Sequence, residues 1–302
     1  MENQKFIWMD GRLAPWNEAK VHFLTHSLHY GTGVFEGIRF YRTPKGPAIF
    51  RLPEHVDRLY ESAKAFSMEI PFSKEEMSRA IIETVAANGL EEGYIRPLVY
   101  LGGKMGLNPV GAPVNCGIAA WPWGAYLAKE AVDTIISKYI RVHPKSGEMA
   151  AKISGVYYNS ALASLEAHRA GVDEAILLDA EGYVAEGPGE NIFIVQKWEI
   201  VTPPLGTILP GITRATVMEL VRDLTSGLMK VQERKFRPID LFNANEAFFT
   251  GTAVEITAIA KVNGLVIGDG KVGETTLFIK DLYNSIVRGQ NEKYDRWLTY
   301  VK

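Results

Sequence analysis

AAKISGVYYNS, residues 150–160, is the stretch around which this chain is organised, and it carries Lys152 among small and aromatic residues. The pattern predicts that Lys152 opens an amphipathic helix and that its ammonium group is buried and crowded. Burial disfavours the charged form of an amine, and the neutral amine is the form that attacks a carbonyl and holds a Schiff base. The alternative interpretation is a surface lysine at a helix start, because lysine side chains are mostly exposed.

The composition is that of a soluble globular enzyme with room for two compact domains. The 302 residues are 47% hydrophobic and 23% charged, with a formal net charge of −2 and no block of like charges. Nucleic-acid binding needs a clustered basic face, so a small-molecule partner is favoured over a nucleic acid. Cys116 is the only cysteine, which excludes an intramolecular disulfide and fits a reducing cytoplasm. No signal peptide and no membrane-spanning segment are expected.

Antiparallel hairpins separated by a few helices dominate the expected secondary structure. Residues 5–14 fold back at Asp10–Gly11, and Asn263–Gly264 is expected to close a second hairpin late in the chain. A helix is expected after Ser73, where Glu76 completes a capping box. This order predicts an α+β fold rather than a doubly wound parallel sheet.

Regular patterning lapses in PWGAYLAKE, residues 122–130, and we place the domain boundary there. The predicted organisation is a small N-terminal domain of residues 1–121, an interdomain loop of residues 122–131 and a larger C-terminal domain of residues 132–302. Trp123 and Tyr126 give this loop aromatic side chains that could close over a ligand.

Familiar catalytic signatures are absent from the sequence. There is no Walker A loop, no dinucleotide-binding GxGxxG, no nucleophile elbow and no zinc-type spacing. His22 and His26 are four residues apart, but no HExxH signature or nearby carboxylate completes a metal site, so none is expected.

The remaining polar residues suit one anionic cofactor. Lys152 supplies an amine, Glu186 lies in a glycine-rich turn, and Arg58 falls between the apolar positions of a helix. Residues 211–213 and 251–252 are rich in backbone N–H and hydroxyl donors. Pyridoxal phosphate needs a lysine for its aldehyde, donors and an arginine for its phosphate, and a carboxylate for its ring nitrogen. Taken singly, these residues also read as a solvated arginine, a turn glutamate and capping threonines.

Eight segments resemble, in order and spacing, those of the branched-chain amino acid aminotransferases. They are HYGTGVFEGIR, HVDRLYESA, YIRPL, WGAYL, the Lys152 segment, EGPGEN, LPGITR and TGTAVEI, and they run through nearly the whole chain. The resemblance implies the fold-type IV architecture of pyridoxal-phosphate enzymes, with a small N-terminal α/β domain, a larger and mostly antiparallel C-terminal domain, and the cofactor between them.

The resemblance also implies the cofactor-binding residues. Lys152 matches the catalytic Schiff-base lysine that shuttles the proton of the substrate Cα, and Glu186 matches the carboxylate at the pyridine nitrogen. Tyr157 matches a tyrosine near the 3-oxygen of the ring. The residues implied at the phosphate are Arg58, Ile212, Thr213 and Thr252.

The implied substrates are the branched-chain L-amino acids, their 2-oxo acids and the pair glutamate and 2-oxoglutarate. The matching residues that line the apolar pocket are Tyr30, Phe35, Trp123, Tyr126 and Tyr157. At the α-carboxylate they are Tyr94 and the turn Gly251, Thr252 and Ala253, and Arg96 is implied at the second carboxylate of glutamate. Tyr30 and Leu107 match positions that reach in from a neighbouring subunit, so a homodimer is the minimum assembly expected.

Two residues depart from the family pattern. Val156 stands where many members have asparagine, and Pro188 replaces a smaller residue in the EGxGEN turn. Neither changes the amine chemistry.

The sequence therefore predicts a ping-pong transaminase that moves the amino group of leucine, isoleucine or valine to 2-oxoglutarate. A D-amino acid aminotransferase or an aminodeoxychorismate lyase on the same fold is the first alternative. A catalytically silent pyridoxal-phosphate-binding protein is the second.

Overall fold

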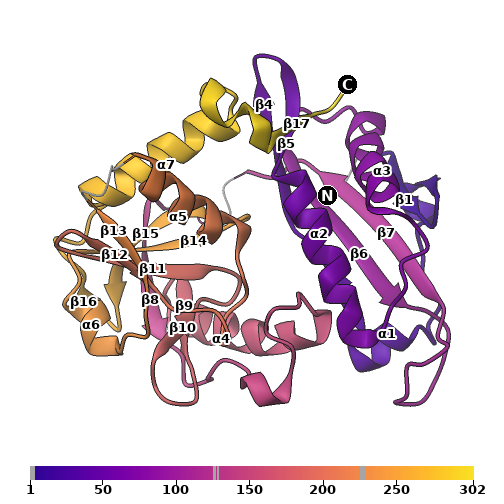
Figure 1. The fold of residues 1–302 in the computed structure, drawn as a ribbon. Coiled ribbons are helices and arrows are strands. Elements are labelled where there is room, and N and C mark those ends of the chain that lie inside the picture. The colour runs from indigo at the N-terminus through magenta and orange to yellow at the C-terminus, as the bar shows by residue number, and fades with distance from the viewer. Residues whose placement is uncertain (1–3, 125–126, 128, 225–228) are drawn as a thin grey trace. The chain divides into compact units, whose positions relative to one another are not determined.

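The computed structural model of the chain describes residues 4–124, 127, 129–224 and 229–302 (Figure 1). By packing, the chain divides into two units. Unit 1 comprises Met1–Gly124, Ala151–Val156 and Ser285–Lys302, and unit 2 comprises Ala125–Ala150 and Tyr157–Asn284.

Unit 1 is built on a sheet in which every neighbouring pair of strands is antiparallel, as far as the structure describes the chain. Its strands run in the order β17 (Leu298–Tyr300), β5 (Gly46–Phe50), β4 (Ile38–Thr43), β6 (Gly93–Leu101), β7 (Val114–Trp121), β1 (Phe6–Met9) and β2 (Arg12–Pro15). The short strand β3 (Gly33–Phe35) also pairs with β6. The predicted turn at Asp10–Gly11 is confirmed, since β1 and β2 pair across it.

Helices α2 (Leu52–Ala63) and α3 (Lys74–Ala87) contact each other and strands of the unit 1 sheet (Figure 1). Their apolar sides and the sheet enclose a core that includes Val56, Leu59 and Ile81. The predicted capping box is confirmed: Ser73 Oγ accepts from Glu76 N at 3.2 Å, and Glu76 Oε2 accepts from Ser73 N at 2.7 Å. The short helix α1 (His26–Tyr30) precedes β3.

Unit 2 is built on a mixed sheet. Its strands run in the order β10 (Val184–Glu186), β9 (Glu174–Leu178), β8 (Ala131–Ile136), β15 (Glu255–Val262), β14 (Glu246–Gly251), β11 (Asn191–Gln196), β12 (Glu199–Thr202) and β13 (Lys230–Glu233). The hairpin strand β16 (Leu265–Val266) pairs with β15 across Asn263–Gly264, as predicted. Since β10 also pairs with β11, the six strands from β10 to β11 form a closed ring. Glu186 and Asn191 face each other where the ring closes.

The remaining helices connect or cover these strands. They are α4 (Tyr157–Arg169), α5 (Ile212–Leu224), α6 (Pro238–Phe242) and α7 (Glu274–Val287), with 3-10 turns at Trp16–Glu18, Lys64–Phe66, Pro144–Ser146, Ser154–Val156 and Glu292–Trp297. The predicted α+β class is confirmed by this mixture of helices and largely antiparallel sheets.

The helix predicted to open at Lys152 is wrong. Lys152 lies outside any helix, next to an isolated bridge at Ile153, a 3-10 turn follows, and α4 begins only at Tyr157. The backbone N–H of Lys152 donates to Ser62 Oγ at 2.9 Å, and its carbonyl accepts from Phe35 N at 3.1 Å. These tertiary partners take the backbone groups that a helix would have used.

The division by packing also differs from the predicted domain boundary. Residues 285–302 belong to unit 1 because β17 adds to the free edge of β5, with Leu298 opposite Phe50. The Arg51 guanidinium lies 3.7 Å from the centroid of the Trp297 ring beside this strand. A strand of only three residues shows too short an alternation of apolar and polar side chains for this pairing to be predicted from the sequence.

Candidate active site

The Lys152 amine is held in unit 1. The side chain is 9% exposed, and Nζ lies 4.9 Å from the centroid of the Phe35 ring. An isolated bridge between Val34 and Ile153 joins the lysine segment to β3. The lysine is therefore fixed through its backbone, while its amine faces an aromatic ring.

Arg58 is fixed by a carboxylate that the sequence analysis did not single out. Arg58 Nε and Nη2 donate to the two oxygens of Glu36 at 2.6 and 2.8 Å, and His55 Nδ1 lies 2.7 Å from Glu36 Oε2. His55 and Arg58 are three residues apart on α2 and so face the same way. Glu36 directly follows β3, and its side chain is fully buried.

The electrostatics of this cluster favour an ionised glutamate. Burial acts to raise the pKa of Glu36, but the charges and hydrogen bonds of Arg58 and His55 outweigh it and hold that pKa well below its usual range. Burial lowers the pKa of His55 despite the neighbouring carboxylate. A neutral His55 that donates from Nδ1 to Glu36 fits both directions. The only sequence signal for Glu36 is a charge between apolar residues in the motif HYGTGVFEGIR.

Phe35, Tyr94, Arg96 and Trp123 come together in unit 1. The Arg96 guanidinium lies 4.7 Å from the Phe35 centroid and 5.6 Å from the Tyr94 centroid, and the Trp123 ring meets Tyr94 edge-on at 4.5 Å. Arg96 Nε is buried without a hydrogen-bond partner in the described part of the chain. Aromatic walls around an unpaired arginine donor suit a ligand with an apolar chain and a carboxylate. Gly37 is required here, because a Cβ at that position would collide with Tyr94 Oη.

Tyr30 and Leu107 lie on the surface of unit 1, where they are 37% and 83% exposed. His26 joins their two segments, since its Nε2 lies 2.8 Å from the Gly106 carbonyl and its ring packs against Tyr30 at 4.5 Å. Tyr126, also predicted for the pocket, lies outside the described residues.

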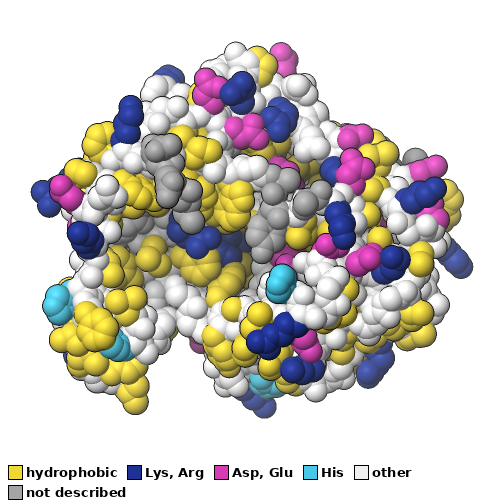
Figure 2. All heavy atoms as spheres, turned by 180° about the vertical axis from the view of Figure 1, so that it is seen from behind, with side chains coloured by type: hydrophobic (Ala, Val, Ile, Leu, Met, Phe, Trp, Pro, Cys, Tyr) yellow, Lys and Arg dark blue, Asp and Glu magenta, His cyan; other side chains and the backbone are white. Residues whose placement is uncertain are grey.

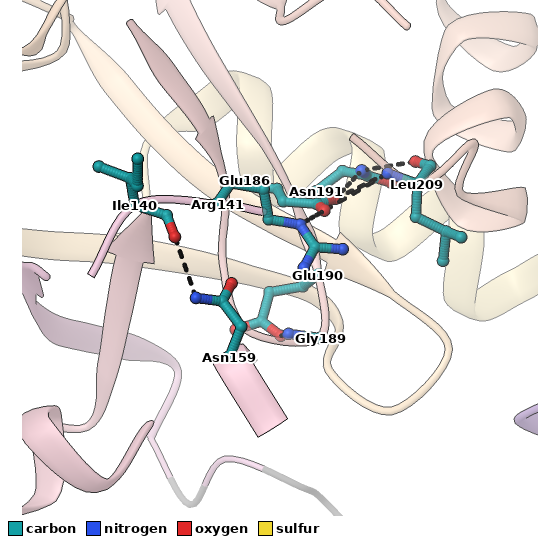
Figure 3. Close-up of polar contacts among 8 residues, drawn as sticks. All are labelled: Ile140, Arg141, Asn159, Glu186, Gly189, Glu190, Asn191 and Leu209. Carbon is teal, nitrogen blue, oxygen red and sulfur yellow. Dashed lines mark hydrogen bonds and ion pairs between the residues drawn. The ribbon is translucent and has the colours of Figure 1, made fainter. Parts of the chain in front are cut away.

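Glu186 is anchored in unit 2 by three donors, as Figure 3 shows. Arg141 Nε donates to Oε1 at 2.6 Å, Asn191 Nδ2 to Oε2 at 3.0 Å, and the Leu209 backbone N–H to Oε2 at 3.2 Å. The Glu186 side chain is almost fully buried. Arg141 Nη1 is also buried and has no hydrogen-bond partner among the described residues. Arg141 was missed in the sequence, where it belongs to none of the eight motifs.

Two donor-rich turns of unit 2 come from α5 and β14. Ile212 and Thr213 begin α5, a helix of 13 residues whose first N–H groups have no partner within the helix. Gly211 before it is packed so tightly that a Cβ would collide with Asn191 Oδ1. Gly251 ends β14, and Thr252 and Ala253 follow in the turn to β15. The preceding Thr250 Oγ1 is buried without a partner among the described residues.

Tyr157 and Val156 adjoin the lysine segment. Tyr157 is the half-buried first residue of α4, whereas Tyr158 is 65% exposed and packs little. Val156 packs against the apolar core of unit 1, where the asparagine of other family members would find few polar partners. The departure at Val156 thus fits its surroundings.

Each unit, taken by itself, contains groups that suit pyridoxal phosphate. Unit 1 has a buried amine and an arginine held in a fixed orientation, and unit 2 has an anchored carboxylate and a helix N-terminus. The buried and unpartnered atoms Arg141 Nη1 and Thr250 Oγ1 are what a polar ligand would satisfy. Among the described residues, no cluster of three or more His, Cys, Asp or Glu side chains could hold a metal ion.

Known proteins resemble this chain over its whole length. The family model of amino-transferase class IV matches residues 33–262. A branched-chain-amino-acid aminotransferase of Pseudomonas aeruginosa is 47% identical over 98% of this chain and 97% of its own. A T.th. branched-chain amino acid aminotransferase, solved with pyridoxamine 5'-phosphate, has a TM-score of 0.95 at 46% identity, over 99% of both chains. Two further structures of that enzyme each have a TM-score of 0.94. One contains N-(5'-phosphopyridoxyl)-L-glutamate, and the other contains 4-methylvaleric acid.

The fold shared with these structures, solved with pyridoxal-phosphate derivatives, defines the class as a fold-type IV pyridoxal-phosphate enzyme. The predicted cofactor is thereby confirmed. The chain belongs to the class IV aminotransferases, and the family predicted from its eight motifs is also confirmed. No helix in the described ranges has the length and apolarity needed to cross a membrane.

Proposed function

We propose that this class IV aminotransferase moves the amino group of L-leucine, L-isoleucine or L-valine to 2-oxoglutarate by a ping-pong mechanism. The observation that carries the proposal is the 47% identity, over nearly the full chain, to an enzyme named for this reaction. The bound cofactor supplies an electron sink for the carbanion that forms at the substrate Cα. Side chains and backbone groups of this chain hold the cofactor and the substrate.

Lys152 is the catalytic residue of this proposal. Its amine would hold the cofactor at its aldehyde until the substrate amine displaces it, and the freed amine would then take the proton from the substrate Cα and return one to the product. Lys152 is 9% exposed and its Nζ lies 4.9 Å from the centroid of the Phe35 ring, so bulk water has little access to the amine.

The other cofactor contacts follow from the same assignment. Glu186 would contact the ring nitrogen, and hydrogen bonds from Arg141, Asn191 and Leu209 fix the direction of its side chain. Tyr157 lies at the 3-oxygen. The phosphate is bound by Arg58, Ile212, Thr213 and Thr252, which bring a guanidinium, a helix N-terminus and hydroxyl groups.

Substrate recognition is assigned to the aromatic cluster of unit 1 and the Gly251–Ala253 turn. Tyr94 and Gly251, Thr252 and Ala253 bind the α-carboxylate. Phe35, Trp123, Tyr126 and Tyr157 contact the branched side chain, and each buried CH₂ contributes about 0.8 kcal/mol. Arg96 binds the second carboxylate of glutamate, and an aliphatic side chain leaves it unused. The T.th. enzyme was solved with both a glutamate derivative and 4-methylvaleric acid, and we extend that dual recognition to this chain.

Arg96→Gln is expected to separate the two kinds of substrate. Loss of one charge-assisted hydrogen bond, about 1.5–3 kcal/mol, should raise KM for 2-oxoglutarate about 10- to 100-fold. KM for L-leucine should change less than about threefold, because a leucine side chain has no group for Arg96. Steady-state kinetics of the two half-reactions measures both values. The exposed Arg79→Gln is the control, and an equal rise for both substrates would contradict the assignment.

The assembly that we propose is a homodimer joined through an apolar surface over α1. Figure 2 shows hydrophobic side chains beside histidines at the lower left of that view. This α1 surface consists of Val21, Phe23, Leu24, Leu28, Tyr30, Met105, Leu107 and Val110, which are between 37% and 83% exposed. The bridge between Thr25 and Gly103 holds its two segments together. An apolar area of this kind usually marks an interaction site, and the family resemblance assigns Tyr30 and Leu107 to the substrate site of a neighbouring subunit.

The double variant Phe23→Asp, Leu107→Asp is expected to lower the mass in solution from a dimer or higher oligomer to a monomer. Two carboxylates inserted in an apolar interface cannot be desolvated without a partner. Light scattering after size-exclusion chromatography gives the mass, and activity should fall with it. Trp198→Asp is the control, since Trp198 is 74% exposed in unit 2. An unchanged mass would remove the α1 surface from the interface.

Two further predictions from the sequence stay within this proposal. We propose residues 122–131 as the interdomain loop, and the hydrogen bond from Arg39 Nη2 to the Trp123 carbonyl, 3.1 Å, supports a fixed start for it. We also propose a cytoplasmic location, which a single, free and buried Cys116 supports.

One spectrophotometric panel tests the reaction against its alternatives. L-leucine, L-isoleucine and L-valine should convert the bound cofactor to its aminated form, and 2-oxoglutarate should restore it. Conversion by D-alanine alone, or turnover of aminodeoxychorismate, would indicate the other activities on this fold. No spectral change with any donor would indicate a silent cofactor-binding protein.

A further inference from the structure

Glu174 and Glu190 form a buried carboxyl pair in unit 2 that the mechanism does not use. Their side chains are 2% and 5% exposed and lie within hydrogen-bonding reach of each other. Glu174 Oε1 accepts from Ala175 N at 2.9 Å, and Glu190 Oε2 accepts from Gly189 N at 2.8 Å. Glu190 Oε1 is buried and receives no hydrogen bond from an N–H or hydroxyl group of the described residues. A proton on one of the two carboxyls is the donor that this arrangement lacks.

The Glu190 side chain contacts the 186–191 turn, which begins at Glu186. Gly187 N donates to the Glu190 carbonyl at 2.7 Å, and a Cβ at Gly187 would lie 2.8 Å from Glu190 Oε1. A Cβ at Gly251 would lie 3.3 Å from the Glu190 Cβ, so the side chain also touches the substrate-binding turn. Figure 3 shows Glu190 beside Gly189, in the loop between Glu186 and Asn191. Glu190 thus lies at the base of the loop that closes the strand ring.

The charged groups that bear on Glu190 are negative. β9 contributes Glu174, β10 contributes Glu186, and the β14–β15 turn reaches it through the uncharged Gly251. The nearby cation Arg141 is paired with Glu186. Two ionised carboxylates in contact, both out of water, repel each other too strongly to persist.

We propose that Glu174 and Glu190 share a single proton, and that the resulting hydrogen bond holds the 186–191 turn closed and keeps Glu186 in position. Glu190 is a positioning residue, because it acts on the cofactor through Glu186. This role rests on the proposed function, whereas the proton sharing does not.

The pKa values of both carboxyls are shifted in the direction that this geometry implies. Burial and the neighbouring Glu174 raise the pKa of Glu190 well above its usual range, and burial raises the pKa of Glu174. From the ordinary glutamate pKa of about 4.3 up to the raised pKa, the native chain binds one proton more than the unfolded chain. The contribution of the pair to stability is therefore complete below the ordinary pKa and is lost as the pH rises through this range.

Glu190→Gln tests the shared proton, because an amide keeps the donor and does not titrate. Just above the ordinary glutamate pKa of about 4.3, the unfolding constant of the wild type should rise up to about tenfold more per pH unit than that of Glu190→Gln, the signature of one proton. Infrared spectroscopy at neutral pH should show a protonated carboxyl band in the wild type that is missing in Glu190→Gln and in Glu174→Gln. Equal pH slopes together with an absent band would overturn the proton sharing.

A second comparison tests the positioning role. In the loaded enzyme, Glu190→Gln should retain pyridoxal phosphate within about twofold, whereas Glu190→Leu, which has no donor, should weaken its retention about tenfold, the equivalent of one hydrogen bond. Glu181→Gln is the matched control, a 68% exposed carboxylate in the preceding hairpin. Equal loss in both Glu190 variants would overturn the positioning role. A wild type that binds no cofactor would instead refute the proposed function and leave the infrared result standing.

Discussion

Lys152→Ala is expected to abolish transamination of L-leucine, with kcat reduced at least about 10³-fold. The substitution removes both the group that binds the cofactor covalently and the base that moves the Cα proton, and general base catalysis alone contributes about 10²–10⁴-fold. Lys152→Arg should be equally inactive, because a guanidinium stays protonated and cannot serve as the base. Stopped-flow measurement of both half-reactions gives the rates.

The fold should survive this substitution. The contacts of Lys152 to Ser62 and Phe35 use its backbone N–H and carbonyl, which alanine retains. Circular dichroism and the urea midpoint of Lys152→Ala should therefore match the wild type, and the exposed Lys145→Ala serves as the activity control. If Lys152→Ala kept more than a tenth of the turnover and the cofactor band of the wild type, another lysine would be the catalytic residue.

Glu36→Gln is expected to lower the free energy of unfolding by about 3–5 kcal/mol. Removing one partner of a buried ion pair leaves the other charge uncompensated, and here that charge is the Arg58 guanidinium. The amide is nearly isosteric with the carboxylate, so a cavity does not contribute to the loss. Urea unfolding of the cofactor-free protein at pH 7 measures this loss, since the phosphate that Arg58 is proposed to bind would supply a counter-charge. Glu61→Gln is the control, since its pair with Lys64 is more than half exposed and contributes at most about 1 kcal/mol.

The effect of Glu36→Gln should depend on pH with a definite sign. The native pKa of Glu36 is held below that of an unfolded glutamate, about 4.3, so its contribution is complete above that value and is lost as the pH falls below it. The difference in the free energy of unfolding between the wild type and Glu36→Gln should therefore become smaller in acid. A loss under about 1 kcal/mol at pH 7 would show that Arg58 finds another counter-charge.

Local signals made parts of the fold predictable. Ser73 and Glu76 are three residues apart and announce a helix start by themselves, and Asn263–Gly264 selects a hairpin from two residues. The non-helical conformation at Lys152 was missed for the opposite reason. Its backbone partners, Ser62 and Phe35, lie about a hundred residues away in the chain, and no neighbouring residue encodes them.

The candidate site shows the same division. Lys152, Glu186 and Arg58 stood out because each is an ionisable residue in a recognisable motif. Their partners did not, since Glu36 precedes Arg58 by 22 residues and Arg141 precedes Glu186 by 45. Only folding brings each pair together. A buried charge needs a counter-charge, but this requirement does not indicate where in the sequence the partner residue lies.

The edge strand β17 has a consequence for how the protein is made. Unit 1 contains the first 124 residues, the Lys152 segment and the last 18 residues, so its sheet is completed by residues 298–300. A ribosome synthesises the chain from its N-terminus, so β5 leaves the exit tunnel long before β17 does. The edge of β5 therefore stays unpaired until β17 has emerged, and the nascent chain meanwhile exposes an open strand edge, the kind of surface that chaperones bind.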